Sequence, residues 1–310
     1  MAPTGPEPAV RRQAAGTILT AAQARDRGLS EGQLRSQAAV RLFHGVYGVD
    51  VDPTDLTVRA RAALLAAGPG CLVCEATALR LHGVALPHRF MSDDSIHLLA
   101  RPGGPGVDIK GIRIHRATTP LTASTEADPP LVDPVDCWLQ LAGRATTEEL
   151  IMVADAIMPR GHPLTTPEAL AVAVEARPGG RGIRAARAAV TQARAGTQSP
   201  METRVRLQLV AAGLPCPLVG YSLSDPTGVT HRLDMAFPDQ RVAVEYGGVA
   251  QVDRLQLEQM TTRRRQIEDL GWRLISVTRA DVRAPEPYIG SVRQALAARE
   301  TRGQTPCLTN

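Results

Sequence analysis

The chain has 310 residues, of which 44% are hydrophobic and 21% are charged. This composition is typical of a folded globular protein and excludes a disordered or low-complexity chain. The length accommodates two domains of about 150 residues each. The formal net charge is +4 at pH 7, which is compatible with nucleic acid as a partner but does not require it.

The sequence contains no apolar run that approaches the roughly 18 residues of a membrane-spanning helix, so we expect no membrane partner. Residues 1–16 lack the apolar stretch of a signal peptide and are expected to form a disordered tail. The five cysteines are odd in number and scattered, which is typical of a reducing compartment and favours a cytoplasmic location. Cys71 and Cys74 form a lone C-x-x-C motif in an apolar stretch and are interpreted as buried thiols.

We expect an α/β protein, α+β overall, that divides into four parts. After the tail, residues 17–90 are expected to form a winged helix-turn-helix domain that binds DNA. Residues 91–195 are expected to form a mixed α/β middle region, and residues 199–300 a C-terminal α/β domain.

The N-terminal part carries two helix-start patterns in quick succession. Thr20 is followed three residues later by Gln23, and Ser30 is followed by Gln33. Both pairs fit a capping box, in which a hydroxyl and a glutamine side chain satisfy two backbone N–H groups reciprocally. Gly28 lies between them as a turn, so the pattern predicts helix, tight turn, helix.

Residues 42–49 alternate like a short β-hairpin, which could be the wing of a winged helix. In that fold the second helix enters the major groove, and Arg41 and His44 near the wing would face phosphates. The side chains expected to reach base edges are Gln33, Arg35, Ser36 or Gln37. The alternative is a small helical pair that merely packs on the rest of the protein.

The stretches ILTAAQARDRGLS, HGVYGV and CEATALRLHGV resemble the N-terminal region of AbiEi-family antitoxin-like proteins. The resemblance covers about the first ninety residues. It implies a winged helix that binds DNA, often at the promoter of its own operon, and a toxin-like partner protein. Helices over 56–67 and 74–82 would complete this domain.

The middle region predicts strands at 95–99 and 109–115, around a turn rich in glycine and proline. Two amphipathic helices follow, in VDPVDCWLQLAG and TTEELIMVADAIM. Glu148, Glu149 and Asp155 are expected on solvated faces, and no metal-ligand cluster is expected in this region. The region is interpreted as scaffold or partner surface. Its core is expected to contain Trp138, Leu139, Ile151, Val153 and Ile157.

The C-terminal domain is expected to run helix, strand, strand, helix, strand, helix. Its first helix begins at Ser199 and Pro200, because proline suits the first helical position, and ends at Gly213. The later elements are expected as strands over 230–238 and 241–247, a helix over 253–270, a strand over 272–278 and a final helix ending near residue 300.

The two central strands predict a pair of facing carboxylates. If Asp239 and Gln240 form a two-residue loop, Pro238 opposes Arg241 and Asp234 opposes Glu245. Opposed residues on one sheet face have Cβ atoms about 5 Å apart. The opposite face is then apolar and is expected to be core; it contains Leu233, Met235, Phe237, Val242, Val244 and Tyr246.

Two acids this close require a positive charge nearby. One candidate is Mg²⁺ bound by Asp234 and Glu245, since hard cations prefer carboxylate oxygens. Such an ion can activate water for phosphodiester hydrolysis. The other candidate is a structural network in which Arg232 or another arginine pairs the acids.

The stretches SPMETRVRLQLVAAGLP, HRLDMAFPDQRVAVEYGG and RRRQIEDLGWRLISVT closely resemble domains related to very-short-patch-repair endonucleases. These domains belong to the PD-(D/E)XK nuclease superfamily, and the resemblance covers nearly all of 199–298. It implies a restriction-endonuclease-like core. Carried over by position, Glu202 is the acid of the first helix, and Asp234 and Glu245 are the metal-binding catalytic pair.

Two positions depart from the family pattern. Where the family places aspartate and then a histidine, this chain has Gly247 and Gln251. Gln251 is retained as a candidate catalytic residue, although it cannot act as a general base near neutral pH. Arg263 and Arg264 could follow a DNA backbone or simply lie on a solvated helix face.

The sequence therefore predicts a DNA-binding protein with a nuclease-fold domain, which uses Mg²⁺ if it is catalytically active. The main alternative is a non-enzymatic, antitoxin-like transcriptional regulator. A nuclease that acts on RNA is the third reading, because a fold does not determine its substrate.

Overall fold

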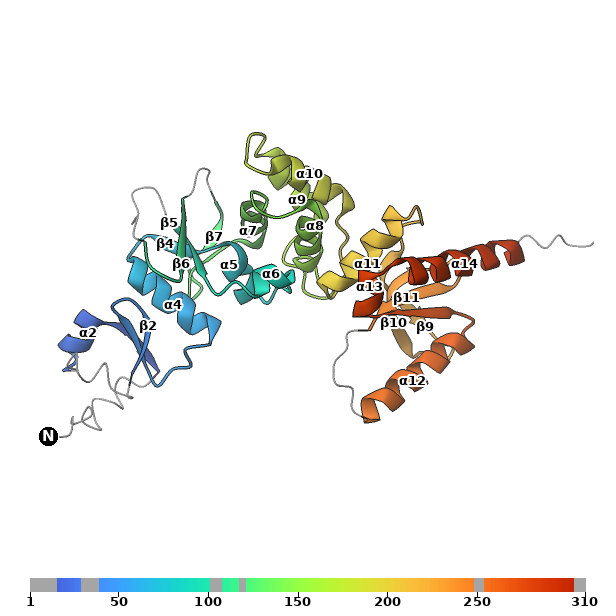
Figure 1. Cartoon of the computed structure of the whole chain (residues 1–310), viewed down its shortest axis with the longest axis horizontal. Helices are drawn as coiled ribbons and strands as arrows, with labels where there is room; N and C mark the ends of the chain where they lie inside the picture. Colours follow the sequence, from blue (N-terminus) through green and yellow to red (C-terminus); the bar gives the residue numbers. More distant parts are fainter. Residues whose placement is uncertain (1–15, 29–38, 101–107, 117–120, 248–253, 304–310) are drawn as a thin grey trace, which may run out of the picture. The chain divides into compact units, whose positions relative to one another are not determined.

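The computed structural model describes residues 16–28, 39–100, 108–116, 121–247 and 254–303, without the side chains of 254–256 and 299–303. Helices and three β-sheets alternate along the chain, so the protein is α+β, as predicted (Figure 1). Two compact units can be distinguished, and the division falls inside the predicted middle region. Unit 1 contains Met1–Ala145 and Ala173–Ile183, and unit 2 contains Thr146–Val172 and Arg184–Asn310.

Unit 1 begins with a three-stranded antiparallel sheet of order β1-β3-β2. Its elements are β1 (Thr17–Thr20), α2 (Ala21–Asp26), β2 (Val40–Phe43), β3 (Val46–Val49) and α4 (Leu56–Ala67). The capping box of Thr20 and Gln23 is formed, which confirms the predicted helix start. The hairpin and the helix over 56–67 are also confirmed, whereas β1 was not predicted. The second helix of the predicted helix-turn-helix lies outside the described residues.

A five-stranded sheet of order β6-β5-β4-β8-β7 follows in unit 1. Strands β5 and β6 pair in parallel, and β4 pairs antiparallel with β5. The predicted strands at 95–99 and 109–115 correspond to β5 and β6. The elements are β4 (Cys71–Val73), α5 (Glu75–Leu81), α6 (His88–Met91), β5 (Ile96–Ala100), β6 (Ile112–Arg116), β7 (Ala123–Ser124), β8 (Leu131–Val132) and α7 (Pro134–Leu141).

Three further helices follow α7 along the chain: α8 (Thr147–Ala156), α9 (Pro167–Glu175) and α10 (Ile183–Gln192). The five residues predicted as core of the middle region are all buried. The prediction for Asp155 is wrong, because this side chain is fully buried and pairs with Arg206 at 2.7 Å. The helical spacing places Asp155 beside apolar residues of α8, and its distant partner cannot be inferred from that spacing.

Unit 2 contains a four-stranded sheet of order β12-β11-β10-β9, in which β11 and β12 are parallel. The predicted order of elements is confirmed, with β9 and the short α13 in addition. Met235 pairs with Val244 and Phe237 with Val242, which is the predicted register. The elements are α11 (Pro200–Ala211), β9 (Leu218–Ser224), β10 (Thr230–Phe237), β11 (Val242–Tyr246), α12 (Arg254–Asp269), β12 (Arg273–Val277), α13 (Arg279–Arg283) and α14 (Glu286–Gly303).

The prediction of the apolar face is wrong for one residue, Leu233. Met235 and Phe237 pack in one cluster, but Leu233 packs in a second cluster with Ala236 and Ala243. The strict alternation therefore breaks near Asp234. The neighbouring strand β9 contains Gly220 with φ +59°, and a glycine with positive φ inside a strand interrupts the regular pleat.

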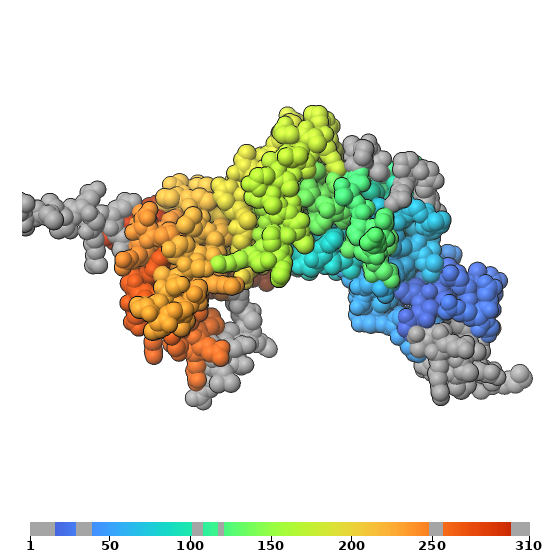
Figure 2. All heavy atoms as spheres, turned by 180° about the vertical axis from the view of Figure 1, so that it is seen from behind, coloured from blue at the N-terminus to red at the C-terminus, as the bar shows by residue number. Residues whose placement is uncertain are grey.

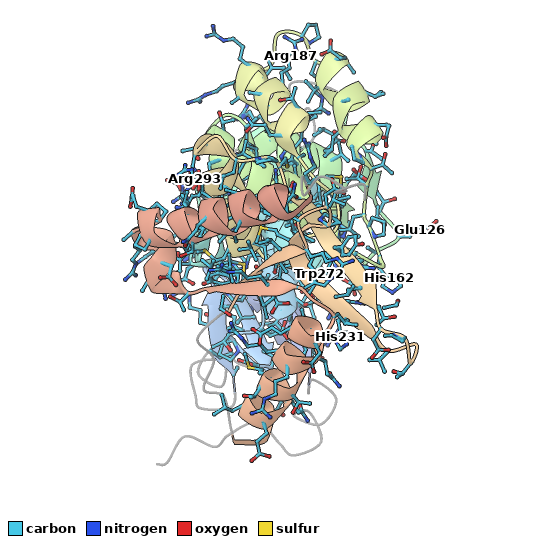
Figure 3. All side chains as sticks on the ribbon, turned by 90° about the vertical axis from the view of Figure 1, so that its right-hand side faces the viewer. Glu126, His162, Arg187, His231, Trp272 and Arg293 are labelled. Carbon is cyan, nitrogen blue, oxygen red and sulfur yellow. The ribbon has the colours of Figure 1, made fainter. Side chains whose placement is uncertain are left out.

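Side chains fill the spaces between the ribbons of each unit when all heavy atoms are drawn (Figure 2). In unit 2, Trp272 just before β12 packs against Tyr221 of β9 with ring centroids 5.6 Å apart (Figure 3). Cys71 and Cys74 are buried free thiols, as predicted. Within the described parts of the chain, no helix has the length and apolar character needed to cross a membrane.

Candidate functional site

Glu202 lies in the first turn of α11 and is 8% exposed. Ser199 caps this helix: its hydroxyl accepts from the Glu202 amide at 3.2 Å. The Glu202 carboxylate accepts in turn from the Ser199 hydroxyl and the Gln198 amide, both at 2.9 Å. These hydrogen bonds hold the acid at the start of the helix, so its position follows from the local capping pattern.

Asp234 and Glu245 come from the neighbouring strands β10 and β11. The Arg241 amide donates to the Pro238 carbonyl at 3.0 Å, so the two-residue loop between them is formed as predicted. Met235 and Val244 are the last paired residues on this side of the ladder. Next to them, the Tyr246 amide donates to Oδ2 of Asp234 at 2.9 Å. A carboxylate thus takes the hydrogen bond that a backbone carbonyl would accept in a continuing ladder.

Arg263 of α12 neutralises Glu245. Its Nη1 and Nη2 donate to the two Glu245 oxygens at 2.8 and 2.5 Å, a bidentate pair. Nη2 also donates to the backbone carbonyl of Arg232. The arginine that pairs the acids is therefore Arg263, which was predicted as a DNA contact. Arg232 contributes only its backbone to this contact, and its side chain is exposed.

The pKa of Asp234 is raised to about 7, first by burial and then by the negative charge of Glu202. The charge of Glu245 raises it further, whereas the Tyr246 amide and Arg263 lower it. Burial also raises the pKa of Glu202, although its two hydrogen bonds oppose this shift. The three predicted acids therefore interact through their charges, and one of them is held near its titration point at neutral pH.

Of the remaining predicted residues of unit 2, those that the structure describes form no side-chain hydrogen bond or ion pair with the three acids. Arg264 is exposed; its Nε pairs with Glu268 at 2.9 Å and its Nη2 donates to the Leu274 carbonyl at 3.3 Å. Gly247 follows β11 and supplies no side chain, as its identity requires. Gln251 lies outside the described residues.

In unit 1, Arg41 and His44 lie together on the β2–β3 hairpin. Arg41 Nη2 is 2.9 Å from Nδ1 of His44, and both side chains are exposed. Gln33, Arg35 and Gln37 lie outside the described residues.

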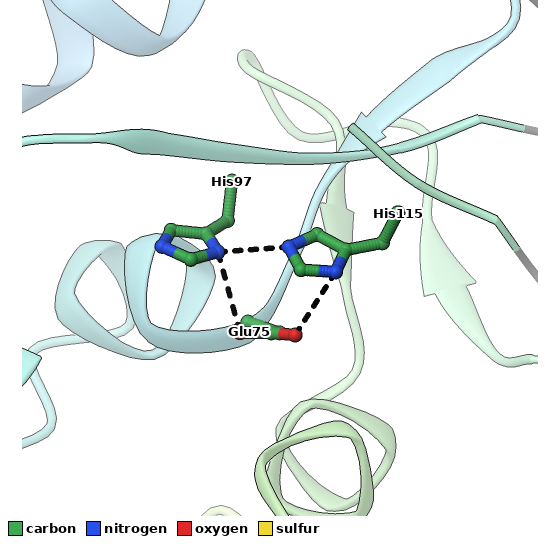
Figure 4. A group of neighbouring side chains, drawn as sticks. All are labelled: Glu75, His97 and His115. Atoms are coloured by element: carbon green, nitrogen blue, oxygen red, sulfur yellow. Dashed lines mark hydrogen bonds and ion pairs between the residues drawn. The ribbon is translucent and has the colours of Figure 1, made fainter. Parts of the chain in front are cut away.

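Unit 1 also contains a cluster that the sequence analysis did not predict, formed by Glu75, His97 and His115 (Figure 4). Within the described residues it is the one group of three or more His, Cys, Asp or Glu side chains whose ligand atoms all lie within 4.8 Å. Nδ1 of His97 is 2.9 Å from Nε2 of His115. The Glu75 carboxylate is 3.3 Å from the first ring and 3.2 Å from the second.

Two further charged groups surround this cluster. Oδ2 of Asp93 is 3.1 Å from Nε2 of His97, and Nη2 of Arg144 is 2.6 Å from Oε2 of Glu75. Burial opposes ionisation of Asp93, but hydrogen bonds from Ser95 and His97 outweigh it and lower its pKa to about 2. Burial likewise opposes ionisation of Glu75, yet the contact with the His97 ring and the nearby positive charges lower its pKa.

The pKa of His115 is lowered, mainly because burial disfavours the charged ring. The Glu75 charge opposes this shift, and the charges of Arg144 and Arg113 contribute to it. The carboxylates of Glu75 and Asp93 are therefore ionised at neutral pH, and His115 favours its neutral form.

The cluster borders a cavity of about 1020 Å³ within unit 1. Glu75 and His115 line this cavity together with several cationic side chains: Arg116, Arg144, Arg177 and Arg181. Glu75 itself has φ +48°, in the left-handed region that is costly for a residue other than glycine. It lies at the turn from β4 into α5, where its amide donates to Oε1 of Gln140 at 3.1 Å.

The sequence contains part of the information that defines this cluster, namely two histidines in predicted strands. His97 interrupts an apolar strand, His115 lies in the next strand, and both strands were predicted. In the parallel register His97 pairs with Arg113 and Leu99 with His115, which places the histidines diagonally on one face. Because the sequence pattern does not reveal which strands are neighbours, the two rings could not be brought together from it.

The chain is similar to two proteins of Mycobacterium tuberculosis. The uncharacterized protein Rv2248 of strain H37Rv and the uncharacterized protein MT2308 of strain CDC 1551 each share 27% identity with it over 257 residues. The alignment covers 81% of this chain and 89% of each relative, so the similarity extends into both units. No family model matches the chain, and no solved structure matches it.

Proposed function

We propose that this chain is a DNA-binding protein whose unit 2 hydrolyses phosphodiester bonds in a Mg²⁺-dependent reaction. The observation that carries the proposal is the placement of Asp234 with Glu202 and Glu245, where burial first and then the charges of these two acids raise the pKa of Asp234 to about 7. Acids that repel one another in this way are stabilised by a bound cation. The resemblance of 199–298 to very-short-patch-repair endonucleases supports the same reading.

The side chains suit a hard divalent cation, because all three candidate ligands are carboxylates. Asp234 and Glu245 would hold Mg²⁺, with Glu202 beside them. When bound, Mg²⁺ supplies an activated water and stabilises negative charge on phosphate oxygens. Arg263 places a guanidinium beside the acids, where it suits a phosphate oxygen as well as a carboxylate. Since Gly247 provides no third polar side chain, we expect slow turnover.

Cleavage assays test this function directly. The purified protein is incubated with supercoiled and single-stranded DNA in Mg²⁺ or Mn²⁺, alongside Asp234→Ala and Glu245→Ala. Wild type should nick DNA and both variants should lose this activity. Asp239→Asn is the matched control, because this exposed acid lies in the loop between the same two strands. Equal nicking by all four proteins, or none by wild type, would refute hydrolysis.

The second candidate is a non-enzymatic regulator that binds DNA and a toxin-like partner protein. The observation that favours it is the bidentate Arg263–Glu245 pair, which already neutralises one of the two proposed metal ligands. In this case, wild type binds DNA without cleaving it, and Mg²⁺ leaves the affinity unchanged. The cleavage assay therefore separates the two functions.

A substitution in the β2–β3 hairpin tests whether unit 1 contacts DNA. Arg41→Ala should weaken DNA binding uniformly across sequences and reduce the salt dependence by about one phosphate contact. Arg113→Ala, which removes an exposed arginine from β6, serves as the control and should change neither quantity. An unchanged salt slope in Arg41→Ala would exclude this phosphate contact. The proposal as a whole assigns the protein to the cytoplasm, where DNA is accessible.

A further inference from the structure

We propose that Glu75, His97 and His115 of unit 1 form a binding site for a divalent transition metal ion, with Zn²⁺ as the representative ion. This site is separate from the carboxylates of unit 2 and uses a different ligand chemistry. It does not depend on the function proposed above.

Hydrogen-bond accounting gives the first argument. Asp93 lies 3.1 Å from Nε2 of His97, so this nitrogen carries the ring hydrogen and Nδ1 keeps a lone pair in the neutral ring. Glu75 Oε1 lies 3.2 Å from Nδ1 of His115, so that ring keeps its lone pair on Nε2. The two lone-pair nitrogens then face each other at 2.9 Å.

The Glu75 carboxylate supplies the third electron-pair donor. Its Oε2 lies 3.3 Å from Nδ1 of His97 and, among the described residues, is a buried atom without a hydrogen-bond partner. Arg144 contributes charge at 2.6 Å, but the contact lacks hydrogen-bond geometry, and Nη2 of Arg144 is also without a partner. Three donors this close repel one another unless a positive charge lies among them, either a proton on one of the rings or a bound metal ion.

The separations suit zinc. Zn–N distances of about 2.1 Å at tetrahedral angles place two ligand atoms about 3.4 Å apart. Two of the three pairs of candidate ligand atoms are 2.9 and 3.3 Å apart, and the ligand atoms of the cluster all lie within 4.8 Å of one another. Two imidazoles and one carboxylate are ligands that Zn²⁺ accepts readily.

The surroundings are those of a metal site in two further respects. Asp93 receives the other ring N–H of His97, which is the arrangement that orients metal-bound histidines. Three protein ligands also leave a fourth position open to water or an anion. Since Glu75 and His115 line the arginine-bearing cavity, an exogenous ligand can reach the cluster from there.

The test is metal binding by the full-length chain after removal of metals with a chelator. Zn²⁺ is titrated by calorimetry, and Co²⁺ is added as a spectroscopic probe of the ligands. Wild type should bind one equivalent in unit 1, with Co²⁺ absorption bands typical of nitrogen and oxygen ligands, and Zn²⁺ should raise its melting temperature. His115→Gln should lose this equivalent, and Asp93→Asn should bind about 10–100-fold more weakly.

The variants separate ligand loss from misfolding. The His115 side chain is 31% exposed, so His115→Gln is the substitution least expected to disturb the fold. Its matched control is His82→Gln, which removes a second part-buried imidazole of unit 1 outside the cluster. Circular dichroism of each variant without metal monitors folding. Equal Zn²⁺ affinity of wild type and His115→Gln, no binding by wild type, or a thiolate band with Co²⁺ would overturn the proposal.

Discussion

Asp234 shows how the carboxylate site of unit 2 depends on a few neighbouring charges. Its burial and the negative charge of Glu202 favour the protonated carboxyl, while the Tyr246 amide and Arg263 favour the ionised form. The balance leaves a pKa of about 7, well above the usual range for aspartate. A small change in local charge therefore changes the ionisation of this residue at physiological pH.

This shift predicts a pH dependence of stability. Because the folded-state pKa is raised, the contribution of Asp234 is fully present below about pH 4 and is lost as the pH rises through the folded value near 7. The free energy of unfolding of wild type should therefore fall across this window relative to Asp234→Asn. Urea unfolding of both proteins between pH 4 and 8, without divalent cations, measures the difference. Parallel pH profiles would contradict the assigned shift.

At the scale of elements, helices α8 and α11 are connected by a buried ion pair between Asp155 and Arg206. Asp155 is 0% exposed and also accepts from Thr203 at 2.9 Å and from the Arg194 amide at 2.6 Å. Burial is the main cause of its raised pKa, and the Arg206 charge opposes that effect. The buried charge of Asp155 therefore depends on Arg206 for its compensation.

Removing one partner is expected to be costly. Arg206→Ala should lower the free energy of unfolding by about 3–5 kcal/mol, because it leaves a buried carboxylate without its counter-charge. The control is Arg204→Ala on the same helix, whose partner Glu148 also lies on α8 but is exposed. That change should cost less than about 1 kcal/mol. Denaturant unfolding of both variants tests the contrast, and equal losses would count against it.

Gly182 lies in the segment after α9 whose residues line the cavity of unit 1. A Cβ atom at this position would overlap the carbonyl oxygen of Ala142 at the end of α7 and lie 2.9 Å from the Gly143 amide nitrogen. Its φ of +79° is also unfavourable for other residues. Glycine is therefore required for the close approach of the two backbones.

Gly182→Ala should reduce stability by roughly 2 kcal/mol or more, because the backbone cannot relieve the overlap without moving. Gly179→Ala is the matched control, since among the described residues nothing lies within 4 Å of a Cβ atom there. Thermal unfolding followed by circular dichroism compares the two. A melting temperature of Gly182→Ala equal to that of Gly179→Ala would show that the segment adapts.

The whole molecule consists of two compact units. One cluster of unit 1 contains Leu19, Ala24 and Val49, whereas the clusters of unit 2 surround its four-stranded sheet. The proposed Mg²⁺-dependent hydrolysis belongs to unit 2 and the proposed transition-metal site to unit 1, so each proposal can fail without the other.

The division into two compact units predicts that they unfold in separate transitions. In differential scanning calorimetry, Gly182→Ala should lower the transition of unit 1, and Arg206→Ala should lower that of unit 2. Each variant should change the free energy of unfolding of the other unit by no more than about 0.5 kcal/mol, since the two residues belong to different units. A single transition that both variants shift equally would mean that the chain unfolds as one cooperative body.

Much of the fold follows from local pattern. The capping boxes of Thr20 and Thr146 start helices because hydroxyl and side-chain acceptor are three residues apart. The register of β10 and β11 follows from a two-residue loop and period-two alternation, which are both local properties. The same alternation failed at Leu233, which packs in the second cluster of unit 2 with Ala236 and Ala243.

The sequence by itself determined the α+β class, the strand register and the identity of three candidate acids in unit 2. Only the tertiary structure decided that Arg263 forms an ion pair with Glu245 and that the side chains of Glu75, His97 and His115 form a cluster. These contacts join segments far apart in the chain, and a periodic pattern contains no information about which segments become neighbours. Helix caps and hairpin registers depend on residues within one or two turns, whereas an ion pair or a ligand cluster depends on how the chain packs.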